Sequence, residues 1–144
     1  MHSNNLILKE LSITDKFEIL DFTKKLNPNK SESDLHENLV DMFTFHNFYI
    51  FGLIQNEKIV GISSAWITVR FYSGKQLELD NFIVDTEIRS KGLGQEFLKL
   101  IEKWAKAKDC KTIELNTYIQ NSRSHKFYFN AGYSILGFHF QKTI

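Results

Sequence analysis

The segment from Arg89 to Gly94 (RSKGLG) combines residue types that bind an anion. Apolar residues at helical spacing continue from it to about Lys106, so it opens a helix whose first N–H groups have no partner within that helix. Gly92 and Gly94 let backbone approach a ligand closely, and two cations add to the positive end of the helix dipole. This pattern predicts a diphosphate site, with a plain capped glycine turn as the alternative.

The glycine loop departs from two common phosphate-binding motifs. No Lys-Ser or Lys-Thr pair follows its second glycine, as a Walker loop requires. The third glycine of a dinucleotide fingerprint is missing, and the loop lies too late in the chain for a second βαβ half to follow. We therefore expect a different ligand that contains a diphosphate.

The elements around the loop predict an α/β protein with a mixed sheet. Alternating and apolar runs predict strands at residues 4–11, 48–54, 59–72, 77–84, 111–118 and 133–140. Periodic segments predict helices that begin near Ser12 or Thr14, near Ser31 or Ser33, at Gly92, and at Asn121 or Ser122. Strand, helix and strand around the loop imply a parallel crossover, and Gly61 suggests a β-bulge.

Composition limits the class of protein. A chain of 144 residues with 42% hydrophobic residues suits one domain, residues 1–144. The net charge of +1 gives no global attraction to nucleic acid or to a membrane, and the first residues contain no signal-like apolar run, so a cytoplasmic protein is expected. A lone Cys110 and five scattered histidines predict no disulfide and no metal site, and Cys110 is interpreted as structural.

Two stretches together resemble the GCN5-related N-acetyltransferase (GNAT) family. They are VDTEIRSKGLGQ, which is similar to the family's acyl-CoA pyrophosphate loop, and NSRSHKFYFNAGY, which is similar to its Asn, Phe-Tyr and Gly-aromatic signature. The order of the predicted elements resembles the family as well. The resemblance implies a single N-acetyltransferase domain with a splayed, mixed β-sheet of six or seven strands and about four helices.

The resemblance also implies acetyl-CoA as the co-substrate, with no metal. By motif position, the backbone of Phe82, Ile83 and Val84 would bind the pantetheine arm, and the side chain of Asn121 would approach it. The pyrophosphate would be surrounded by Arg89, Ser90, Lys91, Gly92, Leu93, Gly94 and Gln95. Dimers are common in the family, and Phe138 and Phe140 would suit the interface of a homodimer.

The implied reaction moves an acetyl group directly to a primary amine of a small molecule or peptide. Most alkylamines are protonated near neutral pH, so a base or a water wire is needed. Glu78 and Asp80 lie two residues apart, on one face of a regular strand, and either carboxylate resembles a base used in the family. Each could instead be solvated or paired with a lysine.

Tyr128 matches the family tyrosine that serves as general acid to the CoA thiolate. Trp66, Phe71 and Tyr72 are expected mostly in the core, with some of them lining an acceptor pocket. The alternative functions are a catalytically silent acyl-CoA sensor or regulatory module and, more weakly, a different nucleotide-phosphate binder. The sequence does not identify the acceptor.

Overall fold

The computed structural model describes residues 5–85, 87 and 92–144. It divides into two compact units, Met1–Glu114 and Leu115–Ile144, which are described separately. The elements of the first unit are β1 (Leu6–Glu10), η1 (Ile13–Asp15), α1 (Lys16–Leu26), α2 (Glu32–Phe43), β2 (Phe48–Gln55), β3 (Lys58–Arg70), β4 (Gly74–Val84) and α3 (Leu93–Ala107). Strand β5 (Thr112–Leu115) follows, and the second unit contains helix α4 (Ser122–Asn130).

The sheet has the order β1-β2-β3-β4-β5, and its first four strands pair antiparallel. Helix α3 connects β4 to β5, and the N–H of Lys111 donates to the carbonyl of Lys75 at 2.7 Å. The two strands therefore begin side by side, as the predicted parallel crossover requires. The mixed α/β architecture is confirmed, although the described residues form five strands instead of six or seven.

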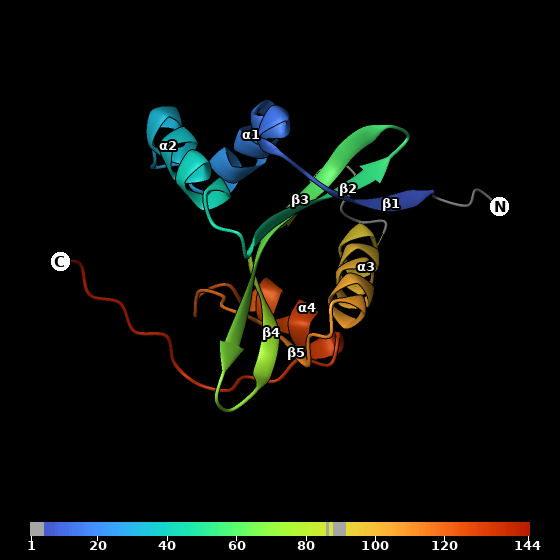
Figure 1. Ribbon diagram of the computed structural model, residues 1–144, viewed down its shortest axis with the longest axis vertical. Helices are drawn as coiled ribbons and strands as arrows, with labels where there is room; N and C mark the ends of the chain where they lie inside the picture. The colour runs from blue at the N-terminus through green and yellow to red at the C-terminus, as the bar shows by residue number, and fades with distance from the viewer. Residues whose placement is uncertain (1–4, 86, 88–91) are drawn as a thin grey trace. The chain divides into compact units, whose positions relative to one another are not determined.

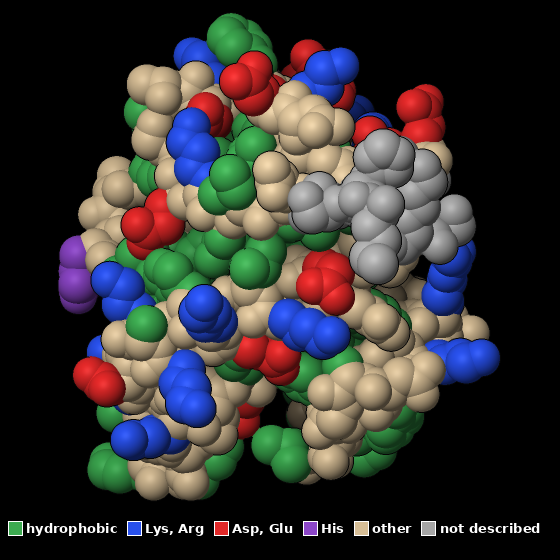
Figure 2. All heavy atoms as spheres, turned by 90° about the vertical axis from the view of Figure 1, so that its right-hand side faces the viewer, with side chains coloured by type: hydrophobic (Ala, Val, Ile, Leu, Met, Phe, Trp, Pro, Cys, Tyr) green, Lys and Arg blue, Asp and Glu red, His purple; other side chains and the backbone are tan. Residues whose placement is uncertain are grey.

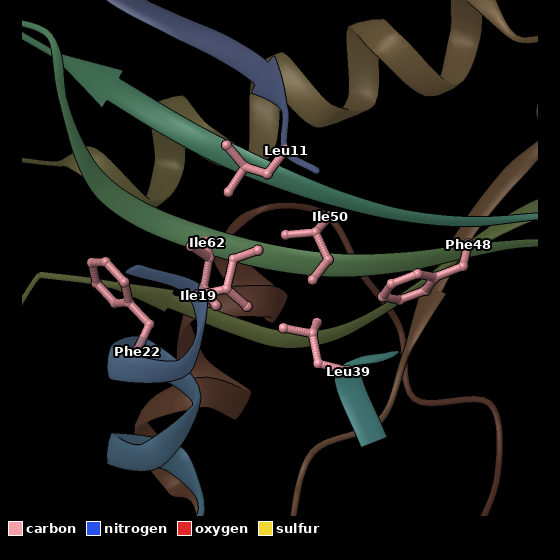
Figure 3. Close-up of a cluster of buried hydrophobic side chains, with 7 residues drawn as sticks. All are labelled: Leu11, Ile19, Phe22, Leu39, Phe48, Ile50 and Ile62. Atoms are coloured by element: carbon pink, nitrogen blue, oxygen red, sulfur yellow. The ribbon is translucent and has the colours of Figure 1, made fainter. Parts of the chain in front are cut away.

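Helices cover both faces of this sheet (Figure 1). Helices α1 and α2 cover one face, and Figure 3 shows the buried cluster there: Leu11, Ile19, Phe22, Leu39, Phe48, Ile50 and Ile62. Helix α3 covers the opposite face, where Trp104 contacts the ring of Phe51 with 4.7 Å between centroids. The sheet is therefore the central layer of the first unit.

Local sequence accounts for most helix ends. Ser31 accepts a hydrogen bond from the N–H of Asp34 and caps α2, and Asn121 accepts one from Ser124 and caps α4. Gly132, with φ of 91°, follows α4 in the left-handed conformation that often ends a helix. The register shift opposite Gly61 confirms the expected bulge.

The predicted closing strands at residues 133–140 are wrong. The structure assigns neither helix nor strand to residues 133–144, and all of them except Tyr133 are exposed. Alternation of β-forming residues gives a segment the capacity to pair, but a strand exists only where another strand supplies hydrogen bonds. Within this chain, the segment has no such partner among the described residues.

Candidate active site

Helix α3 begins at the glycine loop without a side-chain cap. Gly92 is its N-cap residue and has φ of 71°, a left-handed conformation that favours glycine. In contrast to Ser31 and Asn121, which cap their helices, Gly92 offers no side-chain acceptor, and a Cβ atom built on it would meet nothing within 4 Å. The first N–H groups of α3 therefore have no partner within the helix and lie at the positive end of its 15 residues.

The predicted loop residues are only partly described. Gly92, Leu93, Gly94 and Gln95 lie within the described residues, whereas Arg89, Ser90 and Lys91 lie outside them. Leu93 is buried, so its side chain anchors the helix and leaves only its backbone for a ligand. Gln95 is exposed on the first turn of α3.

The end of β4 leads toward this loop. The ring of Phe82 stacks on Phe97 of α3, with 5.1 Å between centroids, and Ile83 packs against the cluster on the opposite face. A Cβ atom on Gly61 would lie 3.0 Å from the carbonyl oxygen of Ile83 and 3.1 Å from Val84. A glycine in β3 is therefore needed where the end of β4 comes close, at the backbone predicted to bind the cofactor arm.

A β-bulge interrupts β4 immediately before this end. Ser64 pairs with Asp80 and Ile62 with Ile83, so two residues of β4 lie opposite one residue of β3. Asn81 lies in the bulge with φ of 53°, a left-handed conformation that asparagine tolerates better than most residues. The strand that was expected to be regular is bent at the residue after Asp80.

Ser64 fastens this bulge. Its buried hydroxyl donates to the backbone carbonyl of Asp80 at 2.8 Å, and the side-chain amide of Asn81 donates to the same hydroxyl oxygen at 3.3 Å. The neighbouring Ser63 contributes a weaker contact to the same carbonyl, at 3.5 Å. Sequence reasoning missed these hydrogen bonds, because the pairing of Ser64 with Asp80 depends on the register of β3 against β4.

Glu78 and Asp80 share one face of the sheet, as their spacing predicts. Glu78 pairs across the strands with Trp66 and Asp80 with Ser64, and cross-strand partners project from the same face. Glu78 accepts hydrogen bonds from Arg70 at 3.1 Å and from the buried Gln76 at 3.3 Å. The expected alternative of a paired carboxylate therefore applies to Glu78, with an arginine in place of a lysine.

Asp80 has different surroundings from Glu78. It forms no ion pair with any described residue, and its carboxylate accepts a hydrogen bond from the N–H of Asn81 at 2.9 Å. Partial burial of the carboxyl group, although the residue as a whole is exposed, raises its pKa, and the nearby Glu78 charge adds to this effect. The Asn81 hydrogen bond opposes the shift without cancelling it. Asp80 thus accepts a proton more readily than an ordinary aspartate.

Aromatic rings lie beside the two carboxylates. Trp66, the partner of Glu78, contacts Phe48 with 4.7 Å and Phe45 with 5.6 Å between centroids. Phe45 remains 55% exposed, so the cluster reaches the surface. Phe71 and Tyr72 do not join it, because both are exposed in the hairpin turn, where Tyr72 donates to Glu114. The expectation that they lie in the core is wrong.

On the same face of the sheet, the buried hydroxyl of Thr68 has no hydrogen-bond partner among the described residues. Thr68 pairs with Gln76 and therefore projects from the same face as Glu78 and Asp80. Its hydroxyl is the one buried side-chain polar atom in the described part of the chain for which no hydrogen-bond partner is found. Buried hydroxyls usually have a partner, so this position suits a water molecule or a ligand group.

Tyr128 lies in the second unit. Its ring contacts those of Phe127 and Tyr133, with 5.0 Å and 5.6 Å between centroids, and its carbonyl accepts from the N–H of Tyr133 at 2.9 Å. Burial raises the pKa of its phenol to about 12, so Tyr128 keeps its proton at neutral pH. Asn121 uses its side-chain oxygen to cap α4, and its approach to a cofactor stays a prediction.

Other reactive side chains have structural partners or unsuitable surroundings. The Nε2 atom of His125 lies 2.9 Å from the carbonyl oxygen of Tyr118. Burial raises the pKa of the Cys110 thiol, which disfavours the nucleophilic thiolate. Among residues 5–85, 87 and 92–144, no three His, Cys, Asp or Glu side chains are grouped to hold a metal ion.

An open hollow of about 450 Å³ lies elsewhere in the first unit. Its lining alternates lysines with carboxylates and includes Lys9, Asp15, Glu18, Glu57 and Lys58. No predicted site residue lines it, and its two lysines stand beside three carboxylates, so it carries no excess of positive charge to hold a diphosphate. The chemistry predicted from the sequence therefore does not lie in this hollow.

Comparison with known proteins identifies the family. The model of the acetyltransferase (GNAT) family matches residues 17–133, which include both motif stretches and all of β2 to α4. The chain belongs to the GNAT family. A search of curated proteins found no significant match.

Several solved structures share the fold. The aminoglycoside N-acetyltransferase AAC(6')-Iy in complex with CoA matches with a TM-score of 0.84 at 14% identity, over 99% of this chain and 97% of that one. A GNAT family acetyltransferase from Staphylococcus aureus matches with a TM-score of 0.74 at 25% identity, over 96% and 98%. A transcriptional regulator from Bacillus halodurans matches with a TM-score of 0.84 at 15% identity, over 97% and 100%. The structural likeness thus extends over nearly the whole length of each chain.

On one face of this GNAT protein, lysine, arginine and acidic side chains are interspersed (Figure 2). No helix in the described part of the chain is long and apolar enough to cross a bilayer.

Proposed function

We propose that this GNAT protein is an acetyl-CoA-dependent N-acetyltransferase that moves an acetyl group directly to a primary amine. One observation carries the proposal: helix α3, which begins at a glycine without a side-chain cap, follows directly after the bulged strand β4 in the chain. Family membership and the CoA bound to a structure of the same fold support it. When bound, acetyl-CoA supplies a thioester whose acetyl group can pass to nitrogen.

The cofactor site fits the described residues. The N–H groups of Leu93, Gly94 and Gln95 are first-turn donors of α3 without partners in the helix, and they suit a diphosphate. After the bulge, Ile83 and Val84 pair again with Ile62 and Gly61 of β3, so the extended arm would bind the main-chain groups of Phe82–Val84 that point away from β3. The side chains of Arg89, Ser90 and Lys91 would add to this site by motif position.

Asp80 is the better base of the two candidate carboxylates. An alkylammonium acceptor must lose a proton before its nitrogen can attack, and a carboxylate with a raised pKa is better matched to that task. Glu78 is held by Arg70 and Gln76, so we assign it to orienting the acceptor or a water molecule beside Thr68. Asp80 would take the proton directly or through that water.

Tyr128 would act on the leaving group of the reaction. Cleavage of the carbon–sulfur bond leaves a CoA thiolate, which needs a proton or a hydrogen-bond donor. With a pKa of about 12, the Tyr128 phenol keeps its proton throughout the neutral range, so it can donate a hydrogen bond to the thiolate as the carbon–sulfur bond breaks.

The acceptor is proposed to be a small molecule or peptide that carries a cationic amine. Glu78 and Asp80 provide negative charge, and Trp66 with Phe45 offers rings that suit a cation or an apolar group beside it. AAC(6')-Iy is named for aminoglycosides, which are amino-bearing molecules, but its identity of 14% leaves the acceptor of this chain open.

A thiol-release assay with acetyl-CoA and a panel of amines tests the proposal. We expect CoA release that depends on one class of amine, and we expect Tyr128→Phe to lower kcat about 100-fold or more while the KM for acetyl-CoA changes little. Tyr133→Phe is the matched control, because it removes a neighbouring phenol on the same unit. Turnover that survives in Tyr128→Phe would remove this tyrosine from the mechanism.

A non-catalytic acyl-CoA sensor is the second candidate. The Arg70–Glu78 ion pair occupies one of the two carboxylates, and a transcriptional regulator shares the fold. Calorimetry that shows tight acetyl-CoA binding, combined with no CoA release across the amine panel, would favour the sensor. Stronger binding of ATP than of acetyl-CoA would contradict both functions.

A further inference from the structure

The ion pair between Arg70 and Glu78 has the features of a weak contact. It consists of one contact, from Nη2 of Arg70 to Oε1 of Glu78 at 3.1 Å, whereas strong arginine–carboxylate pairs use two parallel hydrogen bonds. The two side chains remain 47% and 32% exposed, so water screens the attraction between them. Another cation that reaches Glu78 can therefore replace Arg70 at little cost.

Arg70 reaches Glu78 from a distant position on the same face of the sheet. Glu78 pairs with Trp66 of β3, and Arg70 lies four residues beyond Trp66. Four residues of a strand span about 13 Å, so the two side chains must extend toward each other along the sheet. Thr68 lies between Arg70 and Trp66 on that face, and its buried hydroxyl has no hydrogen-bond partner among the described residues. The arginine thus extends past a group that could bind a polar atom of a ligand.

Glu78 has a second hydrogen-bond donor besides Arg70. The buried Gln76 donates from Nε2 to the same Oε1 atom at 3.3 Å, and the Oε1 atom of Gln76 accepts from the hydroxyl of Ser73 at 2.8 Å. Gln76 is therefore held at both ends of its amide and keeps Glu78 oriented. The other oxygen of Glu78, Oε2, accepts no hydrogen bond from the part of the chain that the structure describes. It is available to a ligand.

We propose that Arg70 competes with the acceptor for Glu78, because its guanidinium occupies the place that a cationic group of the acceptor takes on binding. The inference rests on the proposed function, since it assumes an acceptor with a positive charge. When that group binds, it replaces Arg70, while Gln76 keeps the carboxylate oriented. A neutral ligand that displaced Arg70 would leave Glu78 without a counter-charge. Arg70 is therefore a specificity-determining residue that selects against neutral ligands.

Binding of 1,5-diaminopentane tests this competition without acetyl transfer. Its two ammonium groups suit Glu78 and Asp80, which lie about 7 Å apart along the strand, and uncharged 1,5-pentanediol is the matched control probe. The chain has two tryptophans, Trp66 opposite Glu78 and Trp104 on the α3 face, so their indole N–H resonances report on the site and on a remote position. We expect the diamine, and not the diol, to shift the Trp66 signal while that of Trp104 stays unchanged.

Variants of Arg70 decide the proposal. Arg70→Gln should bind the diamine about two- to fivefold more tightly than wild type, as expected for removal of an exposed ion pair. Arg70→Lys keeps a cation and should stay close to wild type. Lys103→Gln removes the same charge from an exposed position on α3 and should change nothing at physiological ionic strength.

Three results of this titration would overturn the competition. They are the absence of a Trp66 shift, equal binding by wild type and Arg70→Gln, and weaker binding by Arg70→Gln. The last would mean that Arg70 orients Glu78 for the ligand.

Thiol release by the same variants separates this proposal from the proposed function. With the best cationic amine of the panel, Arg70→Gln should lower the KM for the amine and leave kcat nearly unchanged. Tighter diamine binding by Arg70→Gln without any CoA release would contradict the transferase and support the competition. Release with the same amine KM in wild type and Arg70→Gln would contradict the competition alone.

Discussion

The two faces of the β4 region differ in chemistry although the same strand supplies both. Toward α3, Leu77 and Leu79 are buried in an apolar layer with Phe97 and Ile101. Toward α1 and α2, the alternate residues Gln76, Glu78 and Asp80 are polar, and the paired residues of β3 include two hydroxyls. Alternation in a strand thus places buried apolar side chains directly behind the polar side chains of Gln76, Glu78 and Asp80.

Within β4, stability and polarity are assigned to opposite faces. Leu77 and Leu79 contribute burial on the α3 face, whereas on the other face Glu78 and Asp80 lie beside a cluster whose buried side chains come mainly from other elements. The bulge at Asn81 ends the regular alternation of polar and apolar residues in β4. Beyond it, the strand continues to its end at Val84, before the glycine loop. Substitutions on the two faces should therefore have separable effects on stability and activity.

Removing the proposed base should give the largest effect on activity. We expect Asp80→Asn to lower kcat by about 100- to 10,000-fold, because proton removal by a positioned base contributes that much. Glu78→Gln is the matched control on the same face and should cost less, because Arg70 and Gln76 already engage Glu78. Steady-state kinetics with the best amine of the panel measure both, and a larger loss for Glu78→Gln would reverse the assignment.

A core substitution on the α3 face should produce the opposite pattern. Phe97 is fully buried and stacks on Phe82, so Phe97→Ala should lower the free energy of unfolding by about 3–5 kcal/mol. Denaturant titration measures this loss, with the exposed Phe17→Ala as the control. If the folded fraction of Phe97→Ala had lost its activity as completely as Asp80→Asn, the two faces would not be separable.

The two neighbouring serines of β3 sharpen the comparison further. Ser63 and Ser64 are both buried, so each alanine variant should lose about 1–3 kcal/mol of stability. Only Ser64→Ala should also raise the KM for acetyl-CoA, by roughly tenfold, because only Ser64 contacts both Asp80 and Asn81 at the bulge. Asn81→Gly should retain the left-handed backbone and perform better than Asn81→Ala. Equal KM values for the two serine variants would leave Ser64 with a purely structural role.

The smallest expected effect is the pH dependence of stability at Asp80. Its pKa is raised in the folded protein, so the fold binds the proton more tightly than the unfolded chain does. The associated stability is fully present below the ordinary aspartate pKa and is lost as the pH rises through the raised value. Asp80→Asn should therefore gain stability relative to wild type as the pH increases over that interval, as thermal melts can measure. If Asp80→Asn instead lost stability relative to wild type as the pH increased, the raised pKa would be contradicted.

Most of the fold could be predicted because its signals are local. Ser31, Asn121 and Gly132 mark helix ends through their own chemistry, and apolar periodicity locates α3 and the three-strand meander. The alternation of Glu78 and Asp80 was enough to place both on one face. Family membership follows from two motifs whose spacing is visible in the sequence.

The remaining features depend on contacts between distant segments. The ion pair of Glu78 with Arg70 and the capture of the bulge by Ser64 depend on the register of β3 against β4, which no local pattern fixes. The failure of residues 133–140 to form strands has the same origin, since a strand needs a partner that the sequence of one chain does not guarantee. The roles of Tyr128 and Asn121 toward a ligand stay predictions.

The most direct test of the account is a titration of the labelled protein with acetyl-CoA, followed through its backbone amide resonances. We predict that Gly92, Leu93 and Gly94 show the largest shifts, with those of Phe82–Val84 next, because diphosphate and arm would bind their N–H and C=O groups. Shifts concentrated around the hollow lined by Lys9 and Lys58, with the start of α3 unchanged, would contradict the proposed site.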